Sequence, residues 1–256
     1  MPLLRINGLT HYFGGLRAVY DYHLDLVDGE LRGLIGPNGA GKTTIFNLIC
    51  GLYRPTEGEI SLDGKSLVGL RPHQITSQGI GRTFQNLRLF NDLTVLDNVK
   101  IAQYSRIRYG LVDAFLRTGL YWKVEGEIEG RAYRLLEILG IERYADHLAR
   151  NLPYGDQRRV EMARALAIEP KLLLLDEPTA GMSPAEMVEM MDLIQRVREE
   201  FKLTILLIEH RMRVVMGICE LIQAIDFGEL IAEGTPEEIR SDRKVIEAYL
   251  GEEVEA

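Results

Sequence analysis

The distribution of apolar residues along the chain predicts an alternation of strands and helices. Residues 31–35 form a short, mostly apolar run that contains Arg32, residues 172–175 form a continuous apolar run, and residues 204–208 are apolar after Thr204. The last two runs are typical of strands that are buried on both faces of a parallel sheet, and the first also predicts a strand. After the second run, Ser183 and Pro184 form a helix-start signal, and apolar residues follow at helical spacing. This pattern indicates a core of the α/β class.

The N-terminal part of the chain departs from this alternation. Short strands are predicted at residues 4–9, 23–26 and 59–62, and turn signals such as Asp28-Gly29 separate them. Successive strands without a helix between them favour a hairpin-like arrangement. We therefore expect an antiparallel sheet beside the parallel one.

From Gln85 to about Leu152 the pattern becomes mostly helical, with candidate helices at residues 96–104 and 125–139. Residues 106–123, between these helices, are rich in aromatic side chains. Two interpretations of this segment stay open. It is either a helix that packs on its neighbours or a docking surface.

A glycine-rich stretch joins the strand at residues 31–35 to the next helix. It fits the pattern G-x-x-x-x-G-K-[ST], in which glycines let successive backbone N–H groups point into one concavity. The helix adds its own free N–H groups and the positive end of its dipole. Lys42 would bring its charge to the β- and γ-phosphates, and Thr43 would offer a hydroxyl to Mg²⁺. The predicted nucleoside triphosphate site consists of Gly36, Asn38, Gly39, Ala40, Gly41, Lys42, Thr43 and Thr44.

Two adjacent carboxylates, Asp176 and Glu177, follow the buried strand at residues 172–175. A strand that ends beside the phosphate loop is where a second Mg²⁺ anchor is needed, and Asp176 fits that position. Glu177 could polarise the attacking water as a general base. The alternative is that the two carboxylates are purely structural.

Other candidate site residues lie at the ends of predicted strands or turns. Gln85 can ligate Mg²⁺ and sense the γ-phosphate. His210 can donate a hydrogen bond to that phosphate, although a histidine taken alone is more often structural. Phe13 or Tyr12 could stack on a nucleobase, and core packing is the equally simple alternative for both.

Composition and charge narrow the classes of protein. The 256 residues are 46% hydrophobic and 27% charged, which suits a soluble globular protein, and a net charge of -8 argues against a broad basic surface for nucleic acid. Cys50 and Cys219 are expected to be reduced thiols of a cytosolic protein rather than a disulfide or metal pair. No signal peptide and no membrane-spanning run is found, so we expect a cytoplasmic protein that reaches any membrane process from outside the bilayer.

In their order along the chain, these motifs resemble those of ABC-transporter ATP-binding cassettes. The resemblance rests on the phosphate loop, Gln85, residues 152–158, residues 172–177 and His210, and it extends over nearly the whole chain. It implies that Gln85 is the Q-loop residue and that His210 is the switch histidine. Residues 152–156 would be the signature motif.

The resemblance also implies a fold and an assembly. The expected fold is a P-loop NTPase (RecA-like) core with an antiparallel β subdomain, residues 1–86 and 156–256, and an inserted α-helical subdomain, residues 87–155. Phe13 would be the adenine-stacking aromatic. Two cassettes would face each other head to tail, each ATP lying between one phosphate loop and the partner's signature motif. The metal ligands would be Thr43, Gln85 and Asp176. The residues that act in trans would be Pro153, Tyr154, Gly155 and Asp156.

A narrower resemblance points to the ATP-binding subunits of branched-chain amino-acid uptake systems. It rests on residues 13–16, 82–90, 207–210, 232–239 and 248–252. It implies ATP hydrolysis that drives uptake of branched-chain or other hydrophobic amino acids from the inner face of the cell membrane. Permease subunits would dock near Leu87, Leu89 and Phe90.

The signature motif departs from the family pattern L-S-G-G-Q. Pro153 replaces the Ser, Tyr154 the first Gly and Asp156 the Gln. Pro153 has neither a hydroxyl nor an N–H group, so one contact to the partner's γ-phosphate is lost. Gly155 and the N-terminus of the following helix still offer backbone N–H groups. We expect hydrolysis that is slower or more dependent on the partner.

Other functions of the same first motif are alternatives. An exporter or lipid-extraction ATPase is the nearest of them. A soluble cassette protein acting on ribosomes or DNA usually carries paired cassettes or long coiled-coil insertions, and this chain has neither. A small GTPase or nucleotide kinase lacks the signature segment, and no N-K-x-D element for reading guanine is found. The transported substrate is read by other subunits.

Overall fold

The computed structural model describes residues 2–104 and 109–254, with side chains to residue 249. The internal contacts divide the chain into two compact units. The core unit is Met1–Arg82 with Lys171–Ala256, and the helical unit is Thr83–Pro170. The sequence-based division differs from this one, because it places residues 83–86 and 156–170 in the core.

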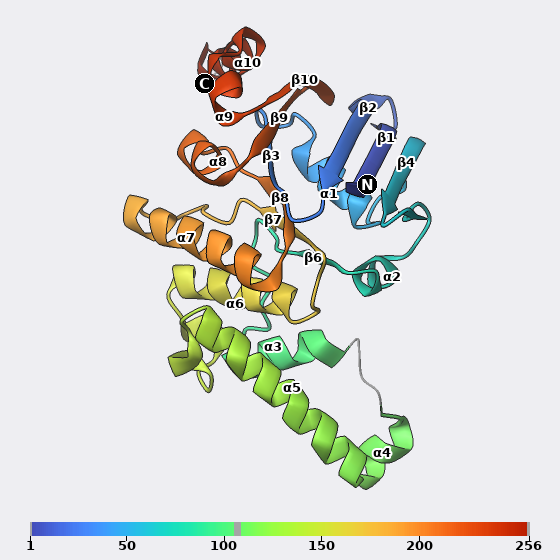
Figure 1. The fold of residues 1–256 in the computed structure, drawn as a ribbon, viewed down its shortest axis with the longest axis vertical. Helices are drawn as coiled ribbons and strands as arrows, with labels where there is room; N and C mark the ends of the chain where they lie inside the picture. The colour runs from blue at the N-terminus through green and yellow to red at the C-terminus, as the bar shows by residue number, and fades with distance from the viewer. Residues whose placement is uncertain (1, 105–108, 255–256) are drawn as a thin grey trace. The chain divides into compact units, whose positions relative to one another are not determined.

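The larger sheet of the core unit has six strands in the order β10-β9-β3-β8-β7-β6 (Figure 1). All neighbours pair in parallel except β10, which runs antiparallel to β9 at one edge. Every residue of β3, β7 and β8 is buried, so the prediction of strands buried on both faces is confirmed. The strands are β3 (Leu31–Ile35), β6 (Ile80–Arg82), β7 (Leu172–Asp176), β8 (Thr204–Ile208), β9 (Leu221–Asp226) and β10 (Glu229–Gly234).

The expected antiparallel sheet is also present in the core unit, with the strand order β2-β1-β4-β5. Its first strand runs past the predicted end, so that Phe13 is the last residue of the strand rather than part of a turn. The turn is confined to Gly14 and Gly15. The strands are β1 (Pro2–Phe13), β2 (Leu16–Val27), β4 (Glu57–Leu62) and β5 (Lys65–Ser66).

The helices of the core unit begin at recognisable sequence signals. At the start of α7 the Ser183 N–H donates to Glu186 Oε2 at 2.9 Å, and the Glu186 N–H donates back to Ser183 Oγ at 3.4 Å. This capping box and Pro184 explain why the helix starts where the sequence predicts. The short helix α2 was not predicted. The helices are α1 (Lys42–Ile49), α2 (Pro72–Ser77), α7 (Pro184–Phe201), α8 (Met212–Ile218), α9 (Pro236–Ser241) and α10 (Arg243–Val254).

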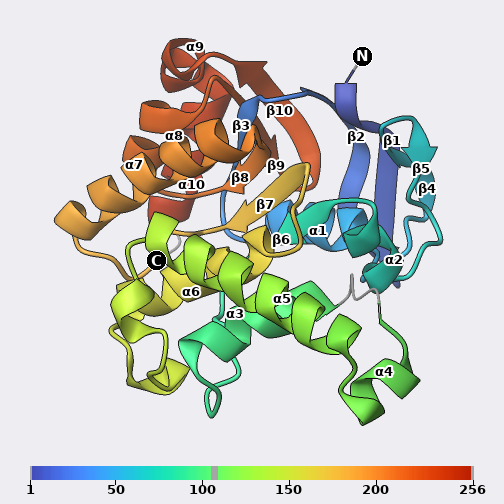
Figure 2. The ribbon, with the colours of Figure 1, turned by 60° about the horizontal axis from the view of Figure 1, so that its bottom comes forward.

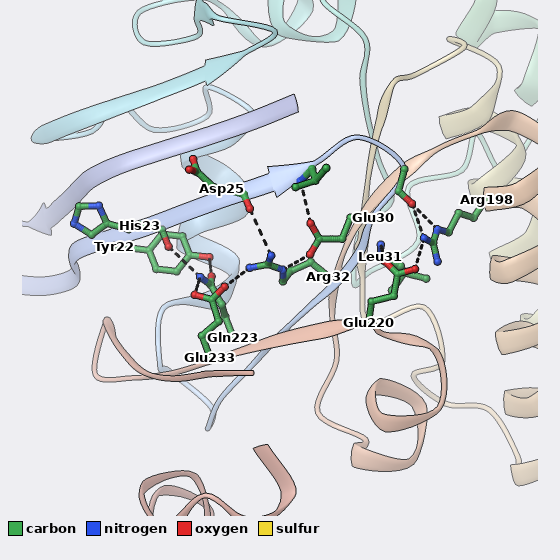
Figure 3. A network of polar contacts seen from close by, with 12 residues as sticks. Tyr22, His23, Asp25, Glu30, Leu31, Arg32, Arg198, Glu220, Gln223 and Glu233 are labelled. Carbon is green, nitrogen blue, oxygen red and sulfur yellow. Dashed lines mark hydrogen bonds and ion pairs between the residues drawn. The ribbon is translucent and has the colours of Figure 1, made fainter. Parts of the chain in front are cut away.

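A buried polar network ties the two sheets of the core unit together (Figure 3). The Arg32 guanidinium, on β3, donates to Glu30 Oε1 and Glu233 Oε1, both at 2.5 Å. Gln223, on β9, donates to Glu233 at 2.9 Å and accepts a hydrogen bond from Tyr22 of β2 at 2.5 Å. Because each charge has an opposite partner, the network fixes the antiparallel sheet beside β3 without leaving an unpaired buried ion.

The described part of the helical unit, residues 83–104 and 109–170, contains four α-helices and two short 3-10 helices (Figure 2). α3 packs against both α5 and α6, and buried Val99, Ile128 and Val160 lie on these three helices. This packing assigns α6 to the helical unit. The helices are α3 (Val95–Gln103), α4 (Leu111–Leu116), α5 (Gly119–Ile138), η2 (Glu142–Tyr144), η3 (Ala149–Asn151) and α6 (Tyr154–Leu166).

Candidate nucleotide site

The glycine-rich loop lies between β3 and α1, as the sequence predicts, and two of its glycines have a packing reason. A Cβ on Gly36 would lie 2.1 Å from the backbone oxygen of Ile225, and a Cβ on Gly41 would lie 2.6 Å from that of Ala18. Gly41 also has φ 107°, in the region that favours glycine. The loop therefore passes too close to its neighbours to accept any side chain at these two positions.

Lys42, the first residue of α1, is buried and turns back over the loop. Its Nζ donates to the backbone oxygens of Gly36 at 2.6 Å and Pro37 at 2.8 Å. These two carbonyls hold the ammonium group inside the curve of the loop. Asn38, Gly39 and Thr43 are exposed on the same loop and at the start of α1. Exposed loop backbone, a buried cation and a free helix N-terminus form a cradle suited to phosphate groups.

The C-terminal helix α10 also reaches the phosphate loop. The Gly36 N–H donates to the hydroxyl oxygen of Tyr249 at 2.9 Å. Tyr249 further lines a cavity of about 690 Å³ between α8, α9 and α10, and His210 lies on the wall of the same cavity. Sequence reasoning gave Tyr249 no role, because a hydrogen bond between residues more than 200 positions apart leaves no local signal.

Asp176 is the last residue of β7, and its carboxylate is buried beside a cation. Arg82 of β6 donates from Nη2 to Asp176 Oδ2 at 2.9 Å and from Nη1 to Asn47 Oδ1 at 2.8 Å. Cys50 lies in the same region, where burial raises the pKa of its thiol and Arg82 opposes that rise. Burial also raises the pKa of the Cys219 thiol, and neither Cys50 nor Cys219 forms a disulfide in the structure.

Glu177 and His210 face each other at the ends of neighbouring strands. The distance between Glu177 Oε2 and His210 Nδ1 is 3.7 Å, and the Glu177 side chain is 14% exposed. Glu177 has φ 49°, and its N–H donates to the Ile208 oxygen at 2.9 Å. The chain thus turns sharply after Asp176, which separates the directions of the two adjacent carboxylates.

Glu209 is a site residue that the sequence analysis missed. Its buried carboxylate accepts from the Thr179 N–H at 3.1 Å and the Thr179 hydroxyl at 2.5 Å, and from the His210 N–H at 3.2 Å. It therefore ties the segment after Glu177 to the segment that carries His210. A charged residue directly after a fully apolar strand was the signal available in the sequence.

Phe13 is 43% exposed and is supported by other aromatic rings. Its ring makes edge contacts with His11 and Tyr53, at centroid distances of 4.6 and 5.1 Å, and His11 stacks on Tyr53. Neither ring nitrogen of buried His11 has a hydrogen-bond partner in the described part of the chain. Tyr12 lies beside this cluster without joining it. The cluster therefore supports Phe13 while much of its side chain stays accessible, as stacking on a planar ligand requires.

The remaining predicted residues belong to the helical unit. Arg158 of α6 donates to the backbone oxygens of Phe84 at 2.7 Å and Gln85 at 2.5 Å, and to the Tyr154 hydroxyl at 2.7 Å. Glu161 accepts from the Phe84 N–H at 3.1 Å, and burial raises the pKa of this carboxyl. The backbone at Gln85 is therefore clamped to the first turns of α6.

The segment around the predicted signature motif begins α6. Pro153 is the N-cap residue of α6 and provides no side-chain cap. Tyr154 is exposed, and Gly155 and Asp156 occupy the first turn. On the predicted docking segment, Phe90 is exposed and stacks under Arg164, while Leu87 and Leu89 are half-buried.

The oxygen donors of the core unit suit Mg²⁺ that arrives with phosphate. Thr43 offers an exposed hydroxyl, and Asp176 a carboxylate. Within residues 2–104 and 109–254, no group of three or more histidine, cysteine, aspartate or glutamate side chains is arranged to hold a metal ion. Mg²⁺ is usually bound by one or two protein oxygens, and phosphate and water oxygens complete its coordination. Thr43 and Asp176 therefore suit this ion.

Comparison with known proteins agrees with this geometry. A family model described as ABC transporter matches residues 19–180, and a second, described as branched-chain amino acid ATP-binding cassette transporter, matches residues 229–255. The chain is 47% identical to the high-affinity branched-chain amino acid transport ATP-binding protein LivG of Escherichia coli, over 98% of both chains. It is 43% identical to BraF of Pseudomonas aeruginosa, over 98% of both chains. It is 36% identical to the lipopolysaccharide export ATP-binding protein LptB of Escherichia coli, over 99% of both chains.

Solved structures share the fold over most of their length. The ADP conformation of the ATP-binding cassette MJ1267 matches with a TM-score of 0.85 and 30% identity, over 98% of this chain and 99% of that one. A dimeric post-hydrolysis structure of the cassette MJ0796, bound to ADP and Pi, matches with a TM-score of 0.77 and 29% identity, over 91% and 98%. The family model matches more than half of the chain, and the relatives match it over almost its full length. The chain therefore belongs to the ATP-binding cassettes of the ABC transporter family.

Proposed function

We propose that the chain is the ATP-binding and ATP-hydrolysing subunit of an ABC importer for branched-chain or other hydrophobic amino acids. The main support is the site geometry of the core unit, where the phosphate loop, Asp176 and the Glu177–His210 pair share one unit. The match of residues 229–255 to the branched-chain family model supports the substrate class. The protein would work as a peripheral subunit on the inner face of the membrane, with no role for nucleic acid. None of the described helices is long and apolar enough to cross a bilayer.

ATP would be held by the phosphate loop and Phe13. Lys42 would exchange its contacts with Gly36 and Pro37 for the β- and γ-phosphates, so the loop carbonyls keep the ammonium in place until nucleotide arrives. Phe13 would stack on the adenine with its accessible side chain. Loop N–H groups and the α1 N-terminus would contact the phosphate oxygens. The loop residues in this role are Gly36, Asn38, Gly39, Ala40, Gly41, Lys42, Thr43 and Thr44.

Thr43, Gln85 and Asp176 would hold Mg²⁺. The bound ion would neutralise part of the negative charge of the phosphates. Glu177 would take the proton of the attacking water, and its distance to His210 allows both side chains to act on one γ-phosphate. Glu209 would position His210 by fixing the backbone on both sides of the pair.

A second cassette, identical or homologous, would complete the site. The dimeric structure of the cassette MJ0796 with ADP and Pi supports a second cassette. In such a dimer, Pro153, Tyr154, Gly155 and Asp156 would face the nucleotide bound to the partner. Arg158 would carry the effect of that contact to Gln85, because it binds both Tyr154 and the Gln85 backbone. Permease subunits would dock near Leu87, Leu89 and Phe90.

Copurification tests this function directly. The tagged chain, extracted from its native membranes in mild detergent, is expected to carry permease subunits of a branched-chain amino-acid uptake system, and the complex should hydrolyse ATP. Copurification with lipid-export membrane proteins instead would support the alternative that the 36% identity to LptB suggests. Recovery without any membrane protein would contradict both.

Replacing Pro153 by Ser should raise the maximal ATPase rate of the assembled transporter. The new hydroxyl could donate to the partner's γ-phosphate, and a hydrogen bond to a charged group contributes about 1.5 kcal/mol, or roughly tenfold in rate. Steady-state hydrolysis in proteoliposomes measures the change. Asn151→Ser, at an exposed position three residues before α6 begins, is the control and should have no effect. An unchanged rate in Pro153→Ser would refute the proposed contact.

A further inference from the structure

The aromatic-rich segment of the helical unit forms an exposed apolar surface. α4 has no buried residue, and the large apolar side chains of α4 and the start of α5 are between 47% and 91% exposed. We call this surface the apolar elbow. It consists of Leu111, Val112, Phe115, Leu116, Leu120 and Trp122. Single exposed apolar residues are ordinary, but six on two adjoining helical segments require an explanation.

The apolar elbow is an ordered structure. Asp113 accepts a hydrogen bond from the Thr118 hydroxyl at 2.8 Å and one from the Gly110 N–H at 3.3 Å, so its carboxylate closes the two ends of α4. Tyr121 makes edge contacts with the rings of Tyr109 and Trp122, both at 5.3 Å. The Asp113 carboxylate is therefore used within the elbow, while the large apolar side chains remain exposed.

The shape and charge of the elbow suit a lipid surface. Figure 2 shows α4 at the N-terminal end of α5, where the backbone of the helical unit projects. Arg117 and Lys123 are exposed within the elbow, and neither side chain forms an ion pair with any residue that the structure describes. Protein segments that lie at the interface of an anionic bilayer typically combine tryptophan, phenylalanine and leucine with lysine or arginine. The elbow has this combination.

We propose that the apolar elbow inserts into the interfacial layer of an anionic membrane. A projecting apolar surface can be buried in a lipid bilayer without a pocket of matching shape, because the lipids rearrange around it. Arg117 and Lys123 would remain at the level of the lipid phosphates while Phe115 and Trp122 enter the acyl boundary. This proposal rests on the proposed function only in one respect: it expects a membrane to lie close to the protein. This second anchor would hold the cassette at the membrane independently of the permease contact at Leu87, Leu89 and Phe90.

Trp122 gives the experiment its readout, because it is the only tryptophan of the chain. The full-length protein is titrated with phosphatidylcholine vesicles that do or do not contain phosphatidylglycerol. Tryptophan emission is expected to shift to the blue with the mixed vesicles, and lipids brominated on the acyl chain should quench it. Phe115→Ser should weaken partitioning by about tenfold, because one large apolar side chain no longer leaves water.

Two further variants separate the contributions. Phe227→Ser removes a phenylalanine that is 80% exposed in the core unit, and it should bind vesicles like the wild type. Arg117→Gln with Lys123→Gln should abolish the preference for phosphatidylglycerol. The proposal is overturned if emission is unchanged with lipid alone, if Phe115→Ser binds equally well, or if the shift requires permeases in the vesicles, since the elbow would then be a protein-docking face. Vesicle binding without nucleotide does not depend on ATP hydrolysis or transport, so failure of this test leaves the proposed function standing.

Discussion

Replacing Glu177 by Gln should lower the ATPase rate constant by about 10²- to 10⁴-fold, the usual contribution of a positioned general base. The amide keeps the size and much of the hydrogen bonding of the carboxylate but cannot take the proton of the attacking water. Since Glu177 makes no part of the phosphate loop, ATP binding should survive, and the ATP-bound dimer should accumulate. Single-turnover hydrolysis measures the rate, and gel filtration with ATP·Mg²⁺ measures the dimer.

The interpretation depends on separating chemistry from binding. Glu199→Gln, which removes an exposed carboxylate on α7, should leave both the rate and the dimer population unchanged. Lys42→Ala, by contrast, should lose nucleotide affinity and form no ATP-dependent dimer, because its ammonium is the cation of the loop. If ATP turns over at the normal rate in Glu177→Gln, then Glu177 is not the base, and its contact with His210 is structural.

Much of the nucleotide site could be predicted because its determinants are local in sequence. The phosphate loop requires glycine for close backbone approach, and that requirement appears directly as Gly36 and Gly41. The continuous apolar run at residues 172–175 predicts a buried strand, so Asp176 and Glu177 could be placed at its end. In each case a short segment carries both the structure and the chemistry.

The contacts that support the site could not be predicted in the same way. Glu209 with Thr179, and Tyr249 with Gly36, join residues that are distant in the chain, and each side chain has many equally plausible roles when taken alone. His11 likewise gained a role only when the fold placed it behind Phe13. Long-range pairings of this kind follow from the topology of the sheets, which periodicity alone does not specify.

The helical unit shows the same limit. The helix at residues 125–139 was predicted, but α5 begins earlier, at Gly119, and the preceding segment forms α4. Aromatic residues at residues 106–123 were compatible with packing or docking, and only the exposure of α4 separates the two. Residues 106–108 of that prediction lie outside the described part of the chain.

Replacing Arg82 by Met should lower the free energy of unfolding of the core unit by about 3–5 kcal/mol, the cost of removing one partner from a buried ion pair. The Arg82 and Asp176 side chains are 7% and 3% exposed, so water cannot replace the lost guanidinium. Methionine fills a volume similar to that of the arginine side chain. The loss of stability therefore measures the effect of the missing charge rather than that of a cavity. Denaturant unfolding followed by circular dichroism measures the change.

Two comparisons identify the buried carboxylate as the cause. Arg243→Met removes an arginine whose side chain is 91% exposed and pairs with Glu247, and it should cost less than about 1 kcal/mol. Adding Asp176→Asn to Arg82→Met should recover most of the lost stability, because the neutral amide needs no buried cation. A loss in Arg82→Met as small as that in Arg243→Met, or no recovery in the double variant, would mean that Arg82 does not stabilise the carboxylate.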